Sequence, residues 1–498
     1  MQIQSANFKK RASTAIADRV LRGSLEKLPF AERRAGVVAD FGIDAFETVR
    51  DAGAAIRDRV LEDLDAWIER FEKEATRRGA TVLFARDGAE ASRLVLEICR
   101  LHGLKKAIKS KSMLSEEADL NRALAAAGVE PVETDLGEYI CQLADEPPSH
   151  IIAPAVHKTR AQIGRLFAER HGKPVLDEPE SMTKEAREVL RGHFLSADLG
   201  ISGGNFLVAE TGSLALVTNE GNGRMVTTLP KVHIAITGVE KVIATLEDLS
   251  TLMRLLPRSA TGQAISNYFS VVTGCGAPVP GANGDQLEGP EHMFFILVDN
   301  GLTRLVGGEL QAMLRCIRCG ACMNHCPVYQ TVGGHSYGWV YPGPMGSVLT
   351  PAFKGIENAL DLPQAATLCG ACSVVCPVKI PLPELLRKLR EQQVERSLRP
   401  RHEMLGLRLW SWFACHPRLY AWATRWGVRL LRLMSDRGDM IRRLPFGSGW
   451  TQGRYMPAPR SAMTFRDWYA REGQNRPRPA HSKVGEPSKI STTSSGMP

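Results

Sequence analysis

The sequence predicts an α/β domain with a mainly parallel sheet, followed by a mostly helical domain and a helical, basic C-terminal segment. Between residues 79 and 300, short runs rich in β-branched residues alternate with helix-like segments, which is typical of a parallel sheet covered by helices. Strand-like runs become rare from residue 301 onward, and Arg and Trp become frequent after residue 397. The length of 498 residues agrees with about three domains, at roughly 100–200 residues each.

A helical N-terminal region is expected over residues 1–78. Between Val60 and Phe71, apolar side chains recur every three or four residues among acidic and basic neighbours, as on one face of a helix. We therefore predict helices from about Ala6 to Arg78.

The α/β domain is predicted over residues 79–300. Its candidate strands are TVLFA, HIIAPAV, NFLVAET, SLALVT and HIAITG, and its candidate helices lie at 88–103 and 115–127. A stretch rich in Gly and Pro, residues 274–292, predicts an irregular loop. No GxGxxG run leads from a strand into a helix and no P-loop motif is present, so a tightly bound dinucleotide is not expected.

Seven of the eleven cysteines fall in two runs within residues 301–396. The first, CIRCGACMNHCP, has the C-x2-C-x2-C-x3-C-P spacing of a 4Fe–4S site, and the second, LCGACSVVCP, repeats part of it. In two-cluster proteins the last cysteine of such a run binds the other cluster. This rule gives cluster 1 the ligands Cys316, Cys319, Cys322 and Cys376, and cluster 2 the ligands Cys326, Cys369 and Cys372.

Cluster 2 is one cysteine short, because Ala366 stands where the second run would begin. Three alternatives stay open: a 3Fe–4S cluster, a 4Fe–4S cluster with an atypical fourth ligand, or a remote thiol such as Cys275 or Cys415. We favour two 4Fe–4S clusters. Zinc is disfavoured, because the four-cysteine run ending in Cys-Pro is more specific than paired CxxC motifs. The long spacing between Cys326 and Cys369 predicts a helical ferredoxin-type domain that transfers electrons.

The remaining cysteines and the chain start indicate the compartment. Eleven cysteines in 498 residues are too few for a disulfide scaffold, and no secretory signal or long apolar run is visible. A cytoplasmic protein is therefore expected, with Cys99 and Cys141 as buried core residues.

The net charge of +9 is concentrated near the C-terminus. Residues 1–383 carry 41 Lys and Arg against 45 Asp and Glu, whereas residues 384–471 carry 18 against 7. In the basic, Trp-rich region at 397–471, Arg alternates with aromatic and aliphatic residues, which suits a partner-docking or membrane-surface helix. We expect docking on an acidic partner subunit, with peripheral contact at the inner face of the membrane or packing on its own core as alternatives. No nucleic-acid reader motif is present, and a disordered tail is predicted at 472–498.

Several further strings resemble one family. They are KSKSM, ETDLGEYICQL, PSHIIAPAVHK, ADLGISGGNFLVAETGSLALVTNEGNGR and LPKVHIAITGVEK, together with the two cysteine runs. With these strings the chain resembles the lactate utilization protein B family. The resemblance implies an iron–sulfur subunit of an L-lactate oxidation system with A-type and C-type partner subunits, an unidentified downstream acceptor, and an α/β fold similar to ribose-phosphate isomerase and CoA-transferase. It also implies that Ala366 is usual, since family members have Ser or Ala there.

The α/β strings also contain residues suited to binding a carboxylate or phosphate. The candidates for a catalytic or binding role are Glu210, Glu220 and Arg224, and further residues able to bind an anion are Asn222, His233, Lys109 and Lys111. For each residue alone, a structural role in a turn or a solvated role is the stronger interpretation, and His150 and His157 are expected to be core histidines. No hydride acceptor is visible, so lactate chemistry is expected on another subunit. The alternative hypothesis is a catalytic α/β domain with the clusters as a redox sensor.

Overall fold

The computed structural model describes residues 4–279, 286–436, 438–445, 447, 451, 455–459, 461 and 463–472. The chain divides into two units, residues 1–398 and 399–498, which are described separately. The tail expected at 472–498 lies outside the described residues except for Glu472.

The first unit begins with five α-helices, as the apolar periodicity predicted. They are α1 (Phe8–Ala17), α2 (Arg19–Glu26), α3 (Phe30–Phe41), α4 (Ile43–Glu62) and α5 (Leu64–Arg77). The Asp18 carboxylate accepts hydrogen bonds from Val20 N and Leu21 N and so caps α2, while Gly42, at φ 93°, ends α3. The helices are therefore separated by short breaks with local sequence causes.

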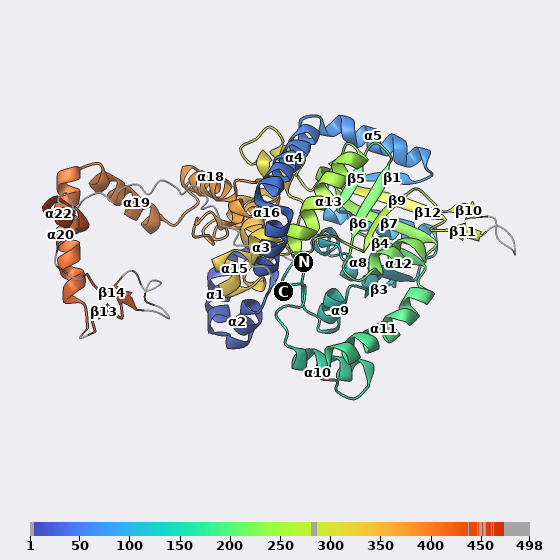
Figure 1. Ribbon diagram of the computed structural model, residues 1–498, viewed down its shortest axis with the longest axis horizontal. Helices are drawn as coiled ribbons and strands as arrows, with labels where there is room; N and C mark the ends of the chain where they lie inside the picture. The colour runs from blue at the N-terminus through green and yellow to red at the C-terminus, as the bar shows by residue number, and fades with distance from the viewer. Residues whose placement is uncertain are drawn as a thin grey trace, which may run out of the picture. The chain divides into compact units, whose positions relative to one another are not determined.

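A six-stranded parallel sheet follows, which confirms the predicted fold class. Its order is β1-β12-β7-β4-β2-β3 (Figure 1). The strands are β1 (Thr81–Ala85), β2 (Lys106–Lys109), β3 (Glu130–Glu133), β4 (Leu199–Ser202), β7 (Val232–Gly238) and β12 (His292–Val298). Phe295 and Leu297 pack into one hydrophobic core, and Ile296 and Val298 into another. Because neighbouring residues of a strand face opposite sides, both faces of the sheet are covered.

Eight helices connect these strands or flank the sheet. They are α6 (Gly88–Leu101), α7 (Met113–Glu117), α8 (Leu120–Ala126), α9 (Leu136–Leu143), α10 (Arg160–His171), α11 (Pro179–Ser196), α12 (Asn222–Thr228) and α13 (Leu246–Ala260). A second sheet has the order β8-β5-β6-β9. Its strands are β5 (Phe206–Val208), β6 (Ser213–Val217), β8 (Val242–Ile243) and β9 (Phe269–Thr273). Cys99 and Cys141 are buried, as expected.

Two local predictions were wrong. The run HIIAPAV is an irregular loop, because the His150 Nδ1 atom accepts hydrogen bonds from Ile152 N (2.9 Å) and Ala153 N (3.0 Å) in place of a strand partner. The stretch 274–292 is not wholly irregular: β10 (Ala277–Val279) and β11 (Gln286–Glu288) pair in antiparallel fashion, and residues 280–285 lie outside the described residues.

Residues 301–396, all of them described, form helices and turns and no β-strand, as predicted for a helical domain. The elements are η3 (Thr303–Leu305), η4 (Gln311–Arg315), α14 (Ala321–Asn324), α15 (Pro327–Val332), η5 (His335–Tyr337), α16 (Gly343–Lys354), η6 (Ile356–Asn358), α17 (Ala371–Val374) and α18 (Leu382–Glu395). In each cysteine run a glycine with positive φ, Gly320 at 74° and Gly370 at 87°, precedes a one-turn helix. The two runs therefore share one local structure.

The N-terminal helices share a hydrophobic core with this helical region. Phe8, Leu25 and Phe46 belong to the same core as Tyr329 and Tyr337. The rings of Phe8 and Tyr337 meet edge to face with centroids 5.3 Å apart. Residues at the start of the chain thus stabilise the region that carries the cysteines.

The second unit is helical and exposes many apolar side chains. Its elements are α19 (Arg401–Ala414), α20 (Pro417–Leu433), β13 (Met440–Ile441), β14 (Met456–Pro457) and α22 (Phe465–Arg471). Neither α19 nor α20 has a buried residue, and Trp410, Trp412, Trp422 and Trp426 are each more than half exposed. Trp450 lies outside the described residues.

Candidate iron-sulfur site

Four cysteine thiols line one small cavity of about 20 Å³. Cys316, Cys319 and Cys322 come from the first run and Cys376 from the second. This is the set expected for cluster 1, and it fits a cubane, whose thiolates each bind a different iron around a central space. Within the described part of the chain, no three or more His, Cys, Asp or Glu side chains are placed to hold a single metal ion. Burial raises the pKa of the Cys376 thiol to about 11, and Cys316 adds to that shift.

The other three thiols form a second group. Burial raises the pKa of Cys326 and of Cys372, the latter to about 12, and Cys369 adds to both shifts by its proximity. Cys369 itself is exposed, and a hydrogen bond from the Thr367 side chain lowers its pKa. The structure therefore brings together the three cysteines assigned to cluster 2, with one of them at the surface.

The missing fourth thiol of this group is not supplied by Cys275. Its Sγ donates a hydrogen bond to Gly79 O (3.0 Å), and its side chain packs against the core around Phe71 and Phe295. Cys326 belongs to a different core. Cys415 lies in the second unit. The carbonyl of Ala366 accepts a hydrogen bond from Arg390 Nη2 (2.9 Å), which fixes the turn where a cysteine would otherwise stand.

Arginines of the N-terminal helices hold the loops that carry the thiols. Arg50 donates to Cys376 O from both Nε (3.0 Å) and Nη2 (2.7 Å), and Arg34 Nη2 donates to Val375 O (3.2 Å). Arg57, which is 1% exposed, donates to Val242 O and Leu314 O, both at 3.0 Å. Sequence reasoning missed these residues. The available signal was that Arg50 and Arg57 stand seven residues apart on the apolar face of α4.

Backbone N–H groups point at the sulfur atoms, and two residues of these loops adopt left-handed conformations. Arg318 N donates to Cys316 Sγ and Ile380 N donates to Cys376 Sγ, both at 3.4 Å. Hydrogen bonds to cluster sulfurs help set the reduction potential. Arg318 (φ 58°) and Leu368 (φ 56°) lie beside cysteines in the left-handed region, where non-glycine residues are strained.

The three α/β candidates are surface residues that make structural contacts. Glu210, Glu220 and Arg224 are all exposed. The Glu210 Oε2 atom accepts from Leu246 N (3.0 Å) at the start of α13, and Glu220 Oε2 accepts from Leu136 N (3.2 Å) at the start of α9. The two carboxylates are therefore helix-capping groups. Arg224 Nε makes a long hydrogen bond to Ser270 Oγ (3.4 Å).

The neighbouring candidates are mostly structural. Lys109 is fully buried, although a lysine near a strand end was expected to be solvated, and its Nζ donates to Asn121 Oδ1 and Glu133 Oε1, both at 2.5 Å. Burial opposes its charge, but Glu133 raises the pKa of Lys109 above its ordinary value. His233 is buried against Ser202 Oγ (2.8 Å), and burial lowers its pKa to about 4.

The core histidines and Asn222 also have structural partners. His150 is buried, as expected, against Asn324 Oδ1 (2.9 Å), and burial lowers its pKa to about 4. His157 lies between Ser149 Oγ (2.7 Å) and Glu146 Oε2 (2.8 Å). Asn222 Nδ2 donates to Thr134 Oγ1 (3.1 Å).

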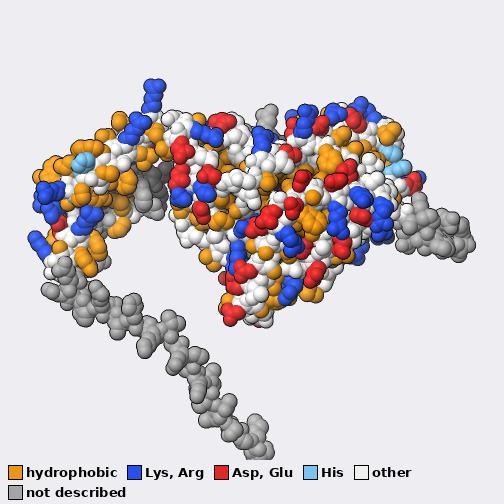
Figure 2. Space-filling view, turned by 90° about the horizontal axis from the view of Figure 1, so that it is seen from above, with side chains coloured by type: hydrophobic (Ala, Val, Ile, Leu, Met, Phe, Trp, Pro, Cys, Tyr) orange, Lys and Arg blue, Asp and Glu red, His pale blue; other side chains and the backbone are white. Residues whose placement is uncertain are grey.

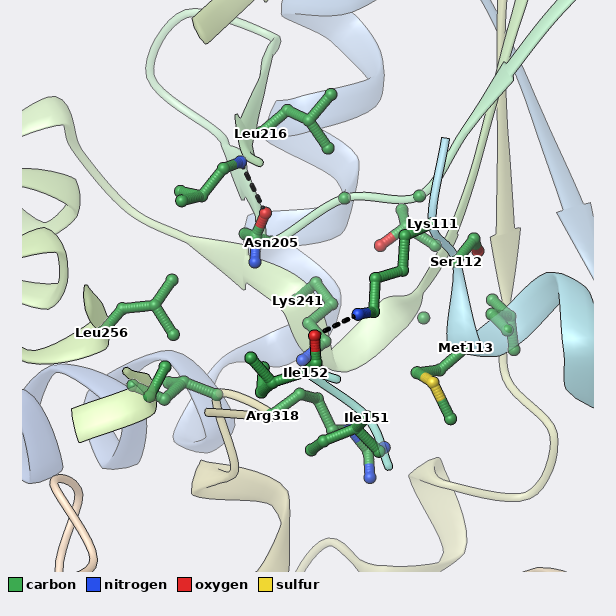
Figure 3. Close-up of a pocket in the computed structure, with 18 of the residues that line it drawn as sticks. Lys111, Ser112, Met113, Ile151, Ile152, Asn205, Leu216, Lys241, Leu256 and Arg318 are labelled. Atoms are coloured by element: carbon green, nitrogen blue, oxygen red, sulfur yellow. Dashed lines mark hydrogen bonds between the residues drawn. The ribbon is translucent and has the colours of Figure 1, made fainter. Parts of the chain in front are cut away.

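A larger cavity, of about 190 Å³, opens at the carboxyl edge of the parallel sheet (Figure 3). Ligands of open α/β sheets bind at this edge. The lining includes residues that follow strands β2, β4, β7 and β12 and residues of the first cysteine run. Its polar members include Lys111, Asn205, Lys241, Asn300 and Arg318. Of the sequence candidates, Lys111 is part of this lining, and its Nζ donates to Ile152 O (2.8 Å).

Charged groups cluster on the side of this cavity nearest the first cysteine run. Arg318 Nη2 lies 3.4 Å from Glu240 Oε1, and its guanidinium lies 4.6 Å from the centre of the Tyr341 ring. Tyr341 donates to Glu117 Oε2 (2.7 Å), and burial raises the pKa of Glu117 to about 7. Lys241 Nζ donates weakly to Cys316 O (3.4 Å), and burial lowers its pKa to about 8. Sequence reasoning missed these five residues, although Glu240 and Lys241 follow the predicted strand HIAITG almost directly.

The described residues contain no helix that is both long and apolar enough to cross a membrane.

Comparison with known proteins covers both parts of the first unit. A family model for the LUD domain matches residues 68–298, and one for a 4Fe-4S dicluster domain matches residues 312–380. Lactate utilization protein B of Bacillus pumilus is 43% identical over 474 residues, which cover 94% of this chain and 98% of that protein. Lactate utilization protein B of Bacillus subtilis is 41% identical over 472 residues, covering 94% and 97%. A solved structure, a DUF162 family protein from Deinococcus radiodurans, has 12% identity, a TM-score of 0.26, and coverage of 47% and 98%.

Proposed function

The chain belongs to the lactate utilization protein B family, and we propose that it carries electrons through two iron–sulfur clusters during the oxidation of L-lactate to pyruvate. The observation that carries this proposal is the grouping of the thiols. Cys316, Cys319 and Cys322 share a cavity with Cys376, which lies far along the chain. Such crossed ligation keeps two clusters close together, and bound clusters of this type exchange single electrons.

We assign a 4Fe–4S cluster to each group. The first has four thiols, and the second has Cys326, Cys369 and Cys372 with a fourth ligand that is not cysteine from the first unit. A 3Fe–4S cluster at the second group is the alternative, and spectra of anaerobically purified protein distinguish the two. A three-iron signal that added iron does not convert would contradict our assignment.

Electrons enter from a lactate-oxidising partner and leave to another protein or to a quinone in this proposal. The exposure of Cys369 supports the second group as the exchange point with a partner. The partners that the family implies are A-type and C-type subunits of the lactate utilization system. The alternative function, a catalytic α/β domain with the clusters as redox sensor, has less support, because its candidates Glu210, Glu220 and Arg224 line neither cavity.

The basic helices α19 and α20 are proposed to dock on an acidic partner subunit. Their surface combines orange apolar and blue basic side chains in Figure 2. Deleting residues 400–498 is expected to abolish co-purification with the partner subunits without changing the iron content. Loss of sedimentation with anionic liposomes instead would favour the membrane alternative, and unchanged behaviour in both assays would leave packing on the chain's own core.

The electron-transfer role is tested by replacing one thiol of the first group. The change Cys319→Ser is expected to remove the signal of cluster 1 and to abolish growth on lactate, because serine does not replace the buried thiolate. Cys99→Ser, in the sheet core, is the matched control and should keep both. Normal growth of the Cys319→Ser strain on lactate would refute the role.

A further inference from the structure

Four buried polar atoms around the larger cavity have no hydrogen-bond partner among the described residues. They are Glu117 Oε1, Thr237 Oγ1, Glu240 Oε2 and Asn300 Nδ2. All four residues line the cavity, and none is more than 9% exposed. An unsatisfied buried polar atom costs about 1–3 kcal/mol, so native proteins keep few of them. Four such atoms around one cavity indicate a polar ligand.

Three cations line the same space from separate segments. Figure 3 shows Lys111 from the segment after β2, Lys241 from the segment after β7, and Arg318 from the first cysteine run. An ammonium has three donors. Lys111 Nζ has a hydrogen bond to Ile152 O, and Lys241 Nζ has a long one to Cys316 O, so both ammoniums have further donors to offer. A carboxylate is the natural acceptor for such donors.

The acidic wall of the cavity limits the charge of the ligand and requires a donor from it. Glu240 and Asp135 also line the space, and they would repel a dianion such as a phosphate ester. The Glu240 Oε2 atom is an acceptor and needs an O–H or N–H group. Gly238 makes room for it, because a Cβ at that position would lie 2.0 Å from this oxygen. The wall therefore suits a monoanion that also carries a hydroxyl group.

The size and the apolar lining restrict the ligand further. A cavity of about 150 Å³ holds benzene, so the ≈190 Å³ here accommodates a molecule of roughly six to eight non-hydrogen atoms. Met113, Leu256 and Phe353 supply apolar contacts for a short carbon chain.

We propose that this cavity binds a small hydroxy carboxylate. Lys111 and Lys241 hold the carboxylate, and the ligand hydroxyl donates to Glu240 Oε2. Arg318 links the ligand to cluster 1, because its backbone N donates to Cys316 Sγ while its side chain lines the cavity. A bound anion would therefore make the potential of cluster 1 more negative, and this second consequence rests on the proposed function.

Binding is tested by isothermal titration calorimetry on the full chain, purified anaerobically, with L-lactate as the hydroxy-carboxylate probe. L-lactate should bind, and propionate, which lacks the hydroxyl, should bind at least tenfold more weakly. Lys241→Gln and Lys111→Gln should each weaken L-lactate binding at least tenfold. Lys231→Gln is the matched control, since Lys231 pairs with Glu291 (3.4 Å) on the surface, and it should leave binding unchanged.

The proposal is overturned if L-lactate does not bind, if both lysine variants bind it as the wild type does, or if propionate or inorganic phosphate binds more tightly. Cluster spectra recorded on each variant show whether it has folded, and the two lysine positions provide independent tests. Wild-type protein with both clusters but no L-lactate binding overturns this inference and leaves the proposed function intact. Wild-type protein without clusters overturns the proposed function, while calorimetry still decides the inference. Redox titration with L-lactate should lower the potential of cluster 1, and an unchanged potential on binding would overturn the placement of the ligand beside it.

Discussion

The two groups of cysteine thiols differ in enclosure and in completeness. The first has four thiols around a cavity, with Arg50 holding the carbonyl of Cys376 and backbone N–H groups pointing at two sulfurs. The second has three thiols, and Cys369 is at the surface. Enclosure protects a cluster from solvent and iron loss, whereas exposure brings a cluster within reach of a partner. In the function proposed above, the first group would therefore hold a protected relay cluster and the second an exposed exchange cluster.

The largest expected effect comes from replacing one cysteine of one thiol group while the other group stays intact. Cys376→Ser should remove cluster 1 and about half of the bound iron, because Cys376 shares a cavity with the three cysteines of the first run. Cys326→Ser should instead remove cluster 2. Iron analysis and electron paramagnetic resonance of the anaerobic variants measure this. If each sequence run built its own cluster, the two variants would show the opposite losses.

A chelator sharpens the comparison without a mutation. We expect iron to leave the three-thiol group at least tenfold faster than the four-thiol group, because Cys369 is exposed and this group has one thiol fewer. The loss is followed by absorbance and by cluster signals during incubation with an iron chelator. Cys326→Ser protein, which retains only cluster 1, is the control and should release its iron in the slow phase alone. Equal rates from both groups would contradict the difference in protection.

A smaller expected effect is a pH dependence of the stability of the fold, which arises from Glu117. Burial raises the pKa of Glu117 from 4.5 to about 7, opposed by Tyr341, Arg318 and Lys354 and assisted by Glu240. Because the folded pKa is the higher one, the stability associated with protonated Glu117 is complete below pH 4.5 and is lost as the pH rises through 7. Relative to Glu117→Gln, the wild type should lose up to ~3 kcal/mol between pH 4.5 and pH 8.

Anaerobic denaturant unfolding of both proteins across this range measures the difference. Glu97→Gln, an exposed carboxylate paired with Arg93, serves as the control and should follow the wild type. If the difference in free energy of unfolding between the wild type and Glu117→Gln did not change with pH, Glu117 would be ionised throughout and the prediction would be wrong.

Much of the fold could be predicted from the sequence, because strands, helices and cysteine spacing are local patterns. Strand β7 could be recognised from HIAITG, and the helical N-terminus from its apolar periodicity. The cavity could not be predicted, since Lys241, Asn300 and Arg318 are brought together only by the strand order and the packing of the cysteine run on the sheet. Glu210 and Glu220 looked functional because they stand in polar turns, but their carboxylates cap the starts of α13 and α9, which lie elsewhere in the sequence. HIIAPAV has strand-like composition, but two of its backbone N–H groups donate to the His150 side chain and not to a neighbouring strand.

The hydrogen bonds from the N-terminal helices to the cysteine loops also bear on how the protein is made. Arg50 and Cys376 are 326 residues apart, and Ser5 Oγ donates to Tyr337 O across 332 residues. The ribosome therefore produces helices α1–α4 long before it produces the surfaces that cover them. Contacts of such long range slow folding and leave apolar faces exposed on the nascent chain. Final packing around the cysteine loops is thus a late event that cannot begin before residue 376 has been made, and a truncated chain that ends before residue 376 would lack the partner of Arg50.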